Sequence, residues 1–163
     1  MKNIDKLAAL GLKPKVRGST AGSIAFDLRP DGVWSIHKSP KPRMGPCEDD
    51  EQARLFFWIR HHGGAMGLRA HSVPNDGGSS KERVGALKRT GLTPGVNDLY
   101  VYSPQGHLAI EMKRENGVWS DVKPNQIEWL QGLVGLPSLT ACVCFGYDAA
   151  MAAISRFILD KRE

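Results

Sequence analysis

The segment GVNDLYVYSPQGHLAIEMKR, residues 95–114, constrains the fold of this 163-residue chain more than any other. It consists of two β-prone runs on either side of Pro104-Gln105, a dipeptide at which a tight turn is expected. A hairpin that turns there pairs Ser103 with Gly106, and this pairing fixes the register of both strands. The segment therefore predicts an antiparallel pair of strands with a defined set of opposed residues.

In this register Asp98 lies opposite Glu111, and Lys113 lies just beyond that pair. Because successive side chains of a strand alternate between its faces, Glu111 and Lys113 share one face with Ala109. The other face carries three apolar side chains, Leu108, Ile110 and Met112. We expect the apolar face to pack into a core and the opposite face to gather two carboxylates and an amine.

Such a cluster has a definite chemistry. Two carboxylates a few ångströms apart repel one another, so the pKa of one should rise unless a cation lies between them. Oxygen ligands of this kind suit Mg²⁺ or Mn²⁺, and a neighbouring lysine can orient or deprotonate a water molecule and stabilise a pentacovalent phosphate. The cluster therefore favours metal-assisted phosphodiester hydrolysis. The alternative is a solvated ion pair of Glu111 and Lys113, because a Glu-x-Lys tripeptide alone is common.

The remaining patterns predict helices and strands in alternation, arranged as an α/β sandwich around a mixed sheet. Acidic residues crowd the first turn of a helix from residue 48, where the helix dipole favours them, and Gly63-Gly64 ends it. Pro124 suits the first turn of a later helix. Further elements are expected at residues 68–73 (strand), 81–91 (helix), 139–146 (strand) and 148–159 (helix).

Three cysteines without zinc-site spacing argue against a disulfide framework. Cys142 and Cys144 alternate with Val143 in a predicted strand, so we expect both as reduced core residues on one face. No apolar run approaches the roughly 20 residues that cross a membrane, and the N-terminus lacks the layout of a signal peptide. The sequence thus predicts no membrane partner and a cytoplasmic location.

The net charge of +5 is concentrated near the N-terminus. Residues 1–47 carry 9 Lys/Arg against 3 Asp/Glu, whereas residues 48–163 carry 13 against 14. We therefore divide the chain into a basic N-terminal extension, with a hairpin turning at Pro30-Asp31-Gly32, and a body from residue 48. A basic extension suits a polyanionic partner, and a solubilising tail is the alternative.

Several motifs in order resemble the virus-type replication-repair nucleases (VRR-NUC), a branch of the PD-(D/E)xK superfamily. The motifs are Glu48-x-x-x-Gln52, His71-Ser-Val-Pro-Asn-x-Gly-Gly, Leu87-Lys-x-x-Gly-x-x-Pro-Gly-Val-x-Asp98-Leu, Ile110-Glu-Met-Lys-Arg and Pro124-x-Gln126-x-x-Trp129-Leu. Together they span about residues 48–158. Asn97 departs from the pattern, because a proline usually precedes the aspartate, and we expect the turn there to be loosened.

The resemblance implies a restriction-endonuclease-like αβα sandwich around a mixed β-sheet, with Mg²⁺ or Mn²⁺ as cofactor. It implies that Asp98, Glu111 and the backbone carbonyl of Met112 hold the metal, and that Lys113 serves the attacking water. Gln126 would reach the site from its helix. Glu48 would add a helix-borne carboxylate, and Glu51 competes for this role. The residues expected to contact DNA are Lys88, Arg89, Arg114, His71 and Asn75.

The resemblance further implies a metal-dependent DNA endonuclease that acts on branched or duplex DNA. Stand-alone phage-type members of the family resemble Holliday junction resolvases working as homodimers, and a phage, prophage or bacterial origin is expected. A non-catalytic DNA-binding module is the alternative, but the intact Asp98, Glu111 and Lys113 favour the enzyme. A small-molecule phosphoesterase suits the basic extension poorly, and the sequence lacks a nucleotide-cradling glycine loop.

Overall fold

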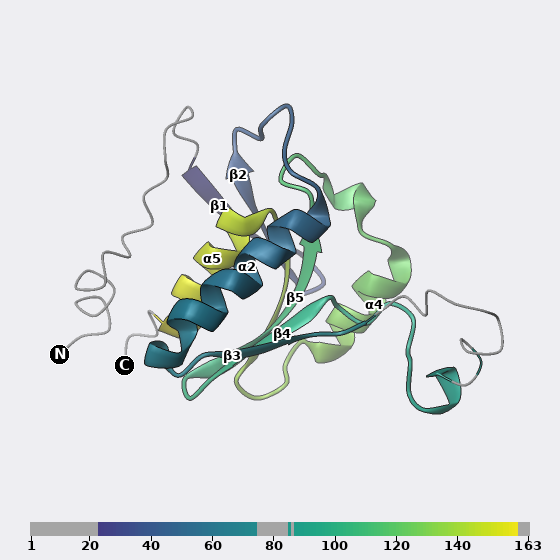
Figure 1. Ribbon diagram of the computed structural model, residues 1–163. Helices are drawn as coiled ribbons and strands as arrows, with labels where there is room; N and C mark the ends of the chain where they lie inside the picture. Colours follow the sequence, from purple (N-terminus) through teal and green to yellow (C-terminus); the bar gives the residue numbers. More distant parts are fainter. Residues whose placement is uncertain (1–22, 75–84, 86, 160–163) are drawn as a thin grey trace.

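The computed structural model describes residues 23–74, residue 85 and residues 87–159, which form a six-stranded sheet with helices on both faces (Figure 1). The strands are β1 (Ser23–Leu28), β2 (Trp34–Ser39), β3 (Arg69–Ser72), β4 (Leu99–Ser103), β5 (Gly106–Lys113) and β6 (Leu139–Phe145). The helices are α2 (Glu48–His62), α4 (Pro124–Leu133) and α5 (Tyr147–Ile154). Shorter helical turns are η1 (Gly63–Met66), η2 (Trp119–Asp121) and the π-helical η3 (Ser155–Leu159).

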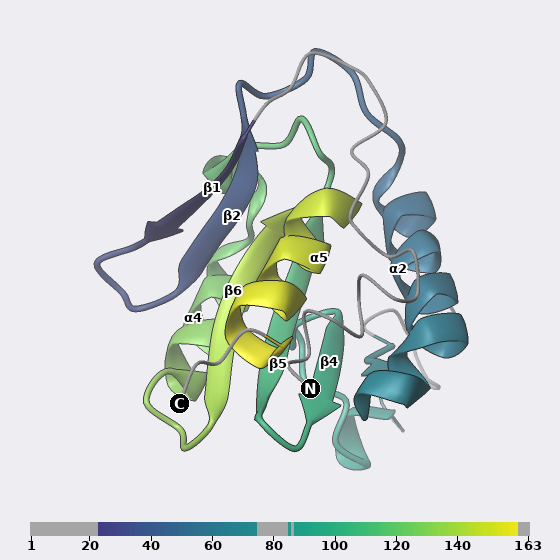
Figure 2. The same cartoon turned by 90° about the vertical axis from the view of Figure 1, so that its left-hand side faces the viewer.

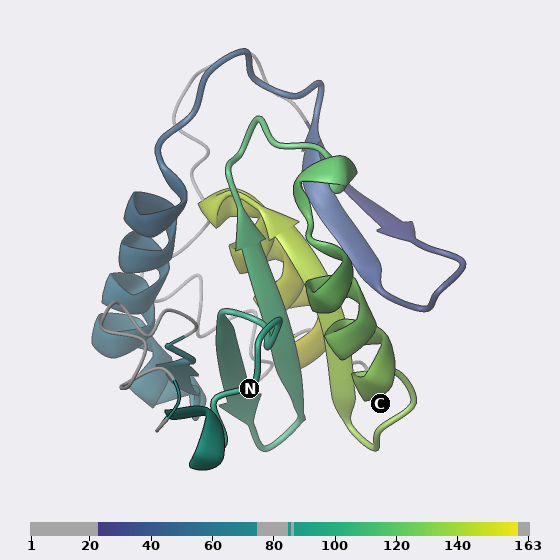
Figure 3. The same cartoon turned by 90° about the vertical axis from the view of Figure 1, so that its right-hand side faces the viewer.

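The sheet is mixed, as predicted, with the strand order β1-β2-β6-β5-β4-β3. β6 lies parallel to both of its neighbours, β2 and β5, and the other pairs are antiparallel. Helices α2 and α5 pack against one face and α4 against the other (Figures 2 and 3). The predicted αβα sandwich around a mixed sheet is confirmed.

The β4–β5 hairpin has the predicted register, in which Ser103 pairs with Gly106 and Leu99 with Ile110. The Ser103 side chain stabilises the turn, since its Oγ accepts hydrogen bonds from the backbone N–H groups of Gln105 and Gly106 at 3.1 and 3.2 Å. The register places every later side chain of β5 on its predicted face.

Alternate residues of β5 enter two separate cores. Leu108, Ile110 and Met112 are fully buried against α2 and α5, whereas Ala109 is buried on the α4 side. Cys142 and Cys144 lie in the same core as Leu108, both as free thiols with their Sγ atoms 3.7 Å apart. The expected reduced core cysteines are therefore present.

The N-terminal extension contains the predicted hairpin, formed by β1 and β2, but this hairpin is not a detached appendage. β2 pairs in parallel with β6, from Trp34 opposite Cys142 to Ile36 opposite Cys144. Ile36 is fully buried in the core under α5. The sequence could not reveal this, because the partner strand lies about a hundred residues away. The boundary at residue 47 stays a prediction.

Of the helix expected at residues 81–91, residues 85 and 87–89 are helical and most of the remainder lies outside the described residues. Within the described part of the chain, no helix has the length and apolar character that a membrane span requires.

Candidate active site

The predicted site residues meet at one end of the sheet. β5 and β6 are parallel, so the end of β5 at Lys113 lies beside the end of β6 at Phe145. Helices α2 and α4 begin at the same end, and β4 starts there because it runs antiparallel to β5. The site is therefore assembled from two strand ends and two helix N-termini, where backbone dipoles favour negative charge.

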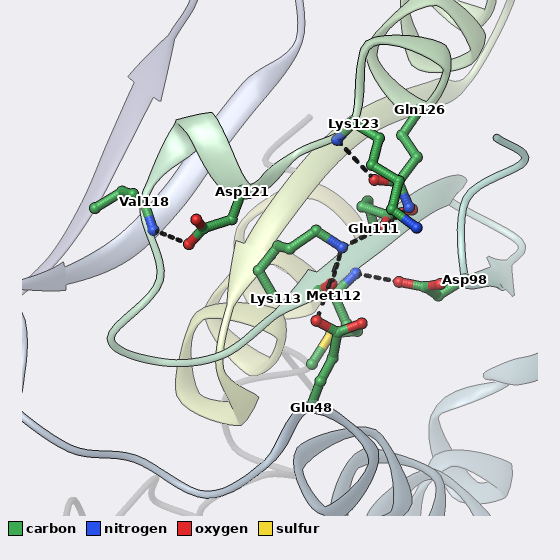
Figure 4. Close-up of polar contacts among 9 residues, drawn as sticks. All are labelled: Glu48, Asp98, Glu111, Met112, Lys113, Val118, Asp121, Lys123 and Gln126. Atoms are coloured by element: carbon green, nitrogen blue, oxygen red, sulfur yellow. Dashed lines mark hydrogen bonds and ion pairs between the residues drawn. The ribbon is translucent and has the colours of Figure 1, made fainter.

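Glu111 and Lys113 form the centre of the cluster, on the α4 face of β5 (Figure 4). The Lys113 Nζ donates hydrogen bonds to Glu111 Oε1 at 2.5 Å and to the carbonyl oxygen of Met112 at 2.9 Å. Asp98 lies across the strand pair, where its Oδ2 accepts a hydrogen bond from the Met112 N–H at 2.7 Å. The hairpin thus brings together the two carboxylates and the amine, as the register predicts.

Gln126 reaches this cluster from the first turn of α4. Its Oε1 accepts a hydrogen bond from the backbone N–H of Lys123 at 2.9 Å, just before the helix. Because that contact fixes the carbonyl end of the amide, the Nε2 end points inward and donates to Glu111 Oε1 (Figure 4). The helix start therefore orients Gln126 toward the carboxylate.

Helix α2 presents Glu48, and not Glu51, to the site. Glu48 Oε2 lies 3.8 Å from Lys113 Nζ, and its side chain is partly exposed toward the cluster. Glu51 is buried, and its Oε2 accepts a hydrogen bond from the backbone N–H of Tyr147, the first residue of α5. Of the two candidates for the helix-borne carboxylate, Glu51 instead caps a neighbouring helix.

Asn97 does not loosen the turn before Asp98, contrary to our expectation. It is fully buried; its Nδ2 donates to the carbonyl oxygen of Leu99 at 2.7 Å and its Oδ1 accepts from Trp129 Nε1 at 3.1 Å. Gly95 lets the same loop approach α4, because it has a φ of +88° and an added Cβ would lie 2.6 Å from the carbonyl oxygen of Asn125. The turn is therefore held against α4 by the hydrogen bond of Asn97 to Trp129 and by the close approach of Gly95 to Asn125.

Burial dominates the electrostatics of the cluster. Burial, and then the charge of Asp98, raise the pKa of the Glu111 carboxyl to about 8. Burial acts to lower the pKa of the Lys113 ammonium, but its contacts with Glu111 and Glu48 outweigh this and the pKa is raised. Burial also raises the pKa of Glu48. Near neutral pH the Glu111 carboxyl and the Lys113 ammonium therefore keep their protons. A cation that binds Glu111 would have to displace the carboxyl proton.

The residues present fit a small divalent cation. Glu111 Oε2 is buried and accepts no hydrogen bond from an N–H or O–H donor of the described residues, while burial and the neighbouring Asp98 carboxyl raise the pKa of Glu111. Asp98 and the Met112 carbonyl supply further oxygen donors beside it, the ligand type that Mg²⁺ and Mn²⁺ prefer. Among the described residues no three His, Cys, Asp or Glu side chains form a metal site. The candidate ligand set is therefore two carboxylates and a main-chain carbonyl.

Comparison with known proteins supports the resemblance seen in the motifs. A solved structure described as a "VRR_NUC domain protein" superimposes with a TM-score of 0.54 and 22% sequence identity, over 71% of this chain and 90% of that chain. The chain shares its fold with that structure. No family model matches the sequence. No curated protein matches it either.

In this fold the cluster opens into a pocket of about 810 Å³. The pocket is lined by Glu48, Asp49, Gln52, Val73, Asp98, Lys113, Arg114, Asn116, Gly117, Asp121, Lys123 and Gln126. Arg114 was predicted as a DNA contact, and it lines the pocket. Lys123 was not predicted, although its place directly before Pro124 at a helix start was a usable signal. Both cations lie where a phosphate group could approach the carboxylates.

The other predicted DNA contacts lie away from this pocket. Lys88 and Arg89 are exposed on the short helical stretch at 87–89, and neither belongs to the described residues that line the pocket. His71 is exposed on β3 and borders a second groove of about 800 Å³ between α2 and β3. Asn75 lies outside the described residues.

The N-terminal extension holds the loop that joins Lys113 to α4. Lys41 Nζ donates to the carbonyl oxygen of Gly117 at 2.5 Å, and Asn116 Nδ2 donates to the Arg43 carbonyl at 3.3 Å. The Arg29 guanidinium lies 4.1 Å from the centre of the Trp119 ring. Because this loop connects β5 with α4 and supplies Asn116 and Gly117 to the lining, the extension positions one wall of the pocket.

Proposed function

We propose that the chain is a metal-dependent DNA endonuclease that hydrolyses phosphodiester bonds. The observation that carries the proposal is the fully buried carboxyl of Glu111, whose Oε2 has no N–H or O–H donor among the described residues and which lies beside Asp98 and Lys113, two residues that line the pocket. Lys113 and Gln126 compensate one oxygen of this carboxyl only, and a bound cation would offset the remaining cost of ionising it next to a second carboxylate. The fold that the chain shares with the VRR_NUC domain protein supports a nuclease as the enzyme class.

In this proposal Asp98, Glu111 and the Met112 carbonyl hold Mg²⁺ or Mn²⁺. When bound, the cation supplies charge neutralisation of the phosphate and acidification of water. The hydrogen bond from Gln126 fixes the orientation of Glu111. Glu48 lies near the ammonium of Lys113 and stabilises its position at the mouth of the site.

Lys113 is the residue of the chain that would act directly on the attacking water or the phosphate. Its ammonium is held by Glu111 and the Met112 carbonyl, which leaves its third donor position for the attacking water or a phosphate oxygen. In hydrolysis the water oxygen bonds to phosphorus, the bond from phosphorus to one sugar oxygen breaks, and that oxygen ends with a proton. A fixed ammonium stabilises the negative charge that develops on the phosphate during this step.

Arg114 and Lys123 favour DNA over a small phosphoester as the substrate. Both line the same pocket, one directly after β5 and one directly before α4, so a backbone with successive phosphates can contact both. Branched DNA, cut by a symmetric dimer, is the specific form of the proposal. A two-fold dimer would place two sites on the two equivalent strands of a junction.

A panel of DNA structures tests this proposal. The full chain is incubated with single-stranded, duplex, flap and four-way-junction DNA, each with Mg²⁺, with Mn²⁺ and with a chelator. We expect cleavage that requires the cation and is fastest on a branched DNA. Binding without cleavage under every condition would contradict the nuclease and support the alternative, a non-catalytic DNA-binding module.

A further inference from the structure

Aromatic rings continue the sheet face that carries the acidic cluster. Tyr100 and Tyr102 follow Asp98 at two-residue steps along β4, so all three side chains point to the same side of the sheet. His71 of β3 pairs directly with Tyr100, and opposed residues of an antiparallel pair also share a face. The rings therefore begin about 7 Å along the strand from Asp98.

The three rings share nearly one orientation. The His71 ring centre lies 5.7 Å from that of Tyr100 and 5.6 Å from that of Tyr102, with interplanar angles of 23° and 14°. The two tyrosine rings are 6.2 Å apart at 16°. His71 is exposed and both tyrosines are half-buried. We call this set, His71, Tyr100 and Tyr102, the aromatic platform.

This face is only partly covered by the core: Tyr100 packs against the apolar cluster under α4, and both tyrosines stay half-buried. The opposite face of β4 carries Leu99 and Val101, and both are fully buried. On the platform's side, α4 packs on β5 and β6, and Figure 3 shows β4 lying beyond the edge of that helix. Rings with polar tips that stay partly exposed suit a surface that binds one flat apolar group and water at once.

We propose that the aromatic platform stacks an unpaired base of the DNA strand whose phosphate lies at the acidic cluster. Each base has a π-face, so stacking on aromatic side chains binds single strands with little dependence on sequence. A base inside a duplex is already covered by its neighbours and is not free to stack on the platform. The proposal rests on the proposed nuclease function and deepens it, because the platform would select DNA with unpaired nucleotides.

The test compares binding of two DNAs by the full chain in the presence of a chelator, so that no cleavage is required. One DNA is a blunt duplex, and the other is the same duplex with a single-stranded tail that contains 2-aminopurine. We expect wild type to prefer the tailed DNA and to quench the 2-aminopurine fluorescence. Tyr102→Leu and His71→Ser should each reduce this preference about tenfold and relieve the quenching, whereas Tyr102→Phe should retain both.

Phe57→Leu is the matched control, since Phe57 is an exposed ring on α2 whose centre lies 4.3 Å from that of His61, and it does not line the pocket. It should leave the preference unchanged. The proposed role of the platform would be overturned if Tyr102→Leu still preferred the tailed DNA and still quenched 2-aminopurine. It would also be overturned if Phe57→Leu lost the preference and the quenching to the same extent. Wild type that cuts DNA without preferring the tail would also overturn it and leave the nuclease standing. Wild type that prefers the tail through the rings but cuts no DNA would contradict only the nuclease.

Discussion

Glu111 is the residue on which the electrostatics of the site depend. It is fully buried, Lys113 and Gln126 both donate to its Oε1, and no N–H or O–H group of the described residues donates to its Oε2. Such a carboxyl resists ionisation unless a cation arrives. The Glu-x-Lys tripeptide is common in sequences, but here its glutamate is distinguished by full burial and by hydrogen bonds from Lys113 and Gln126.

The raised pKa of Glu111 predicts how stability depends on pH without metal. The folded-state pKa of about 8 exceeds the ordinary value of 4.5, so the folded state binds the proton more tightly than the unfolded state. Its contribution to stability is therefore full below the unfolded pKa and is lost as pH rises through the folded pKa. We expect the metal-free protein to unfold at a lower temperature at about pH 9 than at about pH 6.

Glu111→Gln should flatten that difference, since it cannot ionise. Thermal unfolding of both proteins at the two pH values, in a chelator, measures the effect. Equal pH dependence in wild type and Glu111→Gln would show that Glu111 is not the group that titrates. Addition of Mg²⁺ or Mn²⁺ should raise the unfolding temperature of wild type and not of the variant.

The hydrogen bonds of Asn97 predict that this residue stabilises the fold, although a proline is usual at this position in the resembled family. Asn97→Ala removes the acceptor of Trp129 Nε1 and the donor to the Leu99 carbonyl, at a fully buried position. Leaving these groups without partners should lower the free energy of unfolding by about 1–3 kcal/mol, measured by denaturant titration. Asn116→Ala, at an exposed position, is the control and should change it by less than about 0.5 kcal/mol. A neutral Asn97→Ala would mean that the tie between this turn and α4 has no energetic role.

Among the helices, the first turn of α2 carries two acidic residues with different roles. Glu48 faces the candidate site, whereas Glu51 caps α5. Glu48→Gln should slow cleavage about 10- to 100-fold, because Glu48 lies beside Lys113, and leave stability unchanged. Glu51→Gln weakens the cap on α5 and should lower the free energy of unfolding by about 1 kcal/mol with cleavage retained. Cleavage rates and denaturant unfolding of both variants check this, and the reverse pattern would exchange the two assignments.

The elements themselves followed from local signals. The hairpin register was predictable because one turn sets it, and the helix starts at Glu48 and Pro124 because acidic residues and proline mark a first turn. The parallel pairing of β2 with β6 was not, since nothing local in either strand encodes a distant partner. The same reason hid the hydrogen bond between Asn97 and Trp129, which forms only when α4 packs on the sheet.

At the scale of the whole molecule, the basic extension has two parts with different roles. Residues 23–39 supply two strands of the sheet, so a deletion of residues 1–47 would remove part of the core. Residues 1–22 carry five Lys/Arg and one Asp/Glu, a net +4 out of the chain's +5. A test of the extension's charge must therefore stop at residue 22.

Deletion of residues 1–22 should weaken DNA binding and flatten its dependence on salt, because fewer phosphate counterions are released. Each lost phosphate contact lowers the slope of log K against log salt by about 0.9. Binding titrations at several salt concentrations measure the slope, and denaturant unfolding confirms that the fold is kept. An unchanged slope would mean that these residues are a solubilising tail and not a DNA contact.

In the proposed nuclease, Asp98, Glu111 and Lys113 form one catalytic centre. The most direct measurement is the rate of DNA cleavage in Mg²⁺ or Mn²⁺ by wild type, Asp98→Asn and Lys113→Ala, with DNA binding by the same proteins measured alongside. We predict that each variant cuts at least about a hundredfold more slowly than wild type and binds DNA with similar affinity. Cleavage by either variant at the wild-type rate would contradict the account.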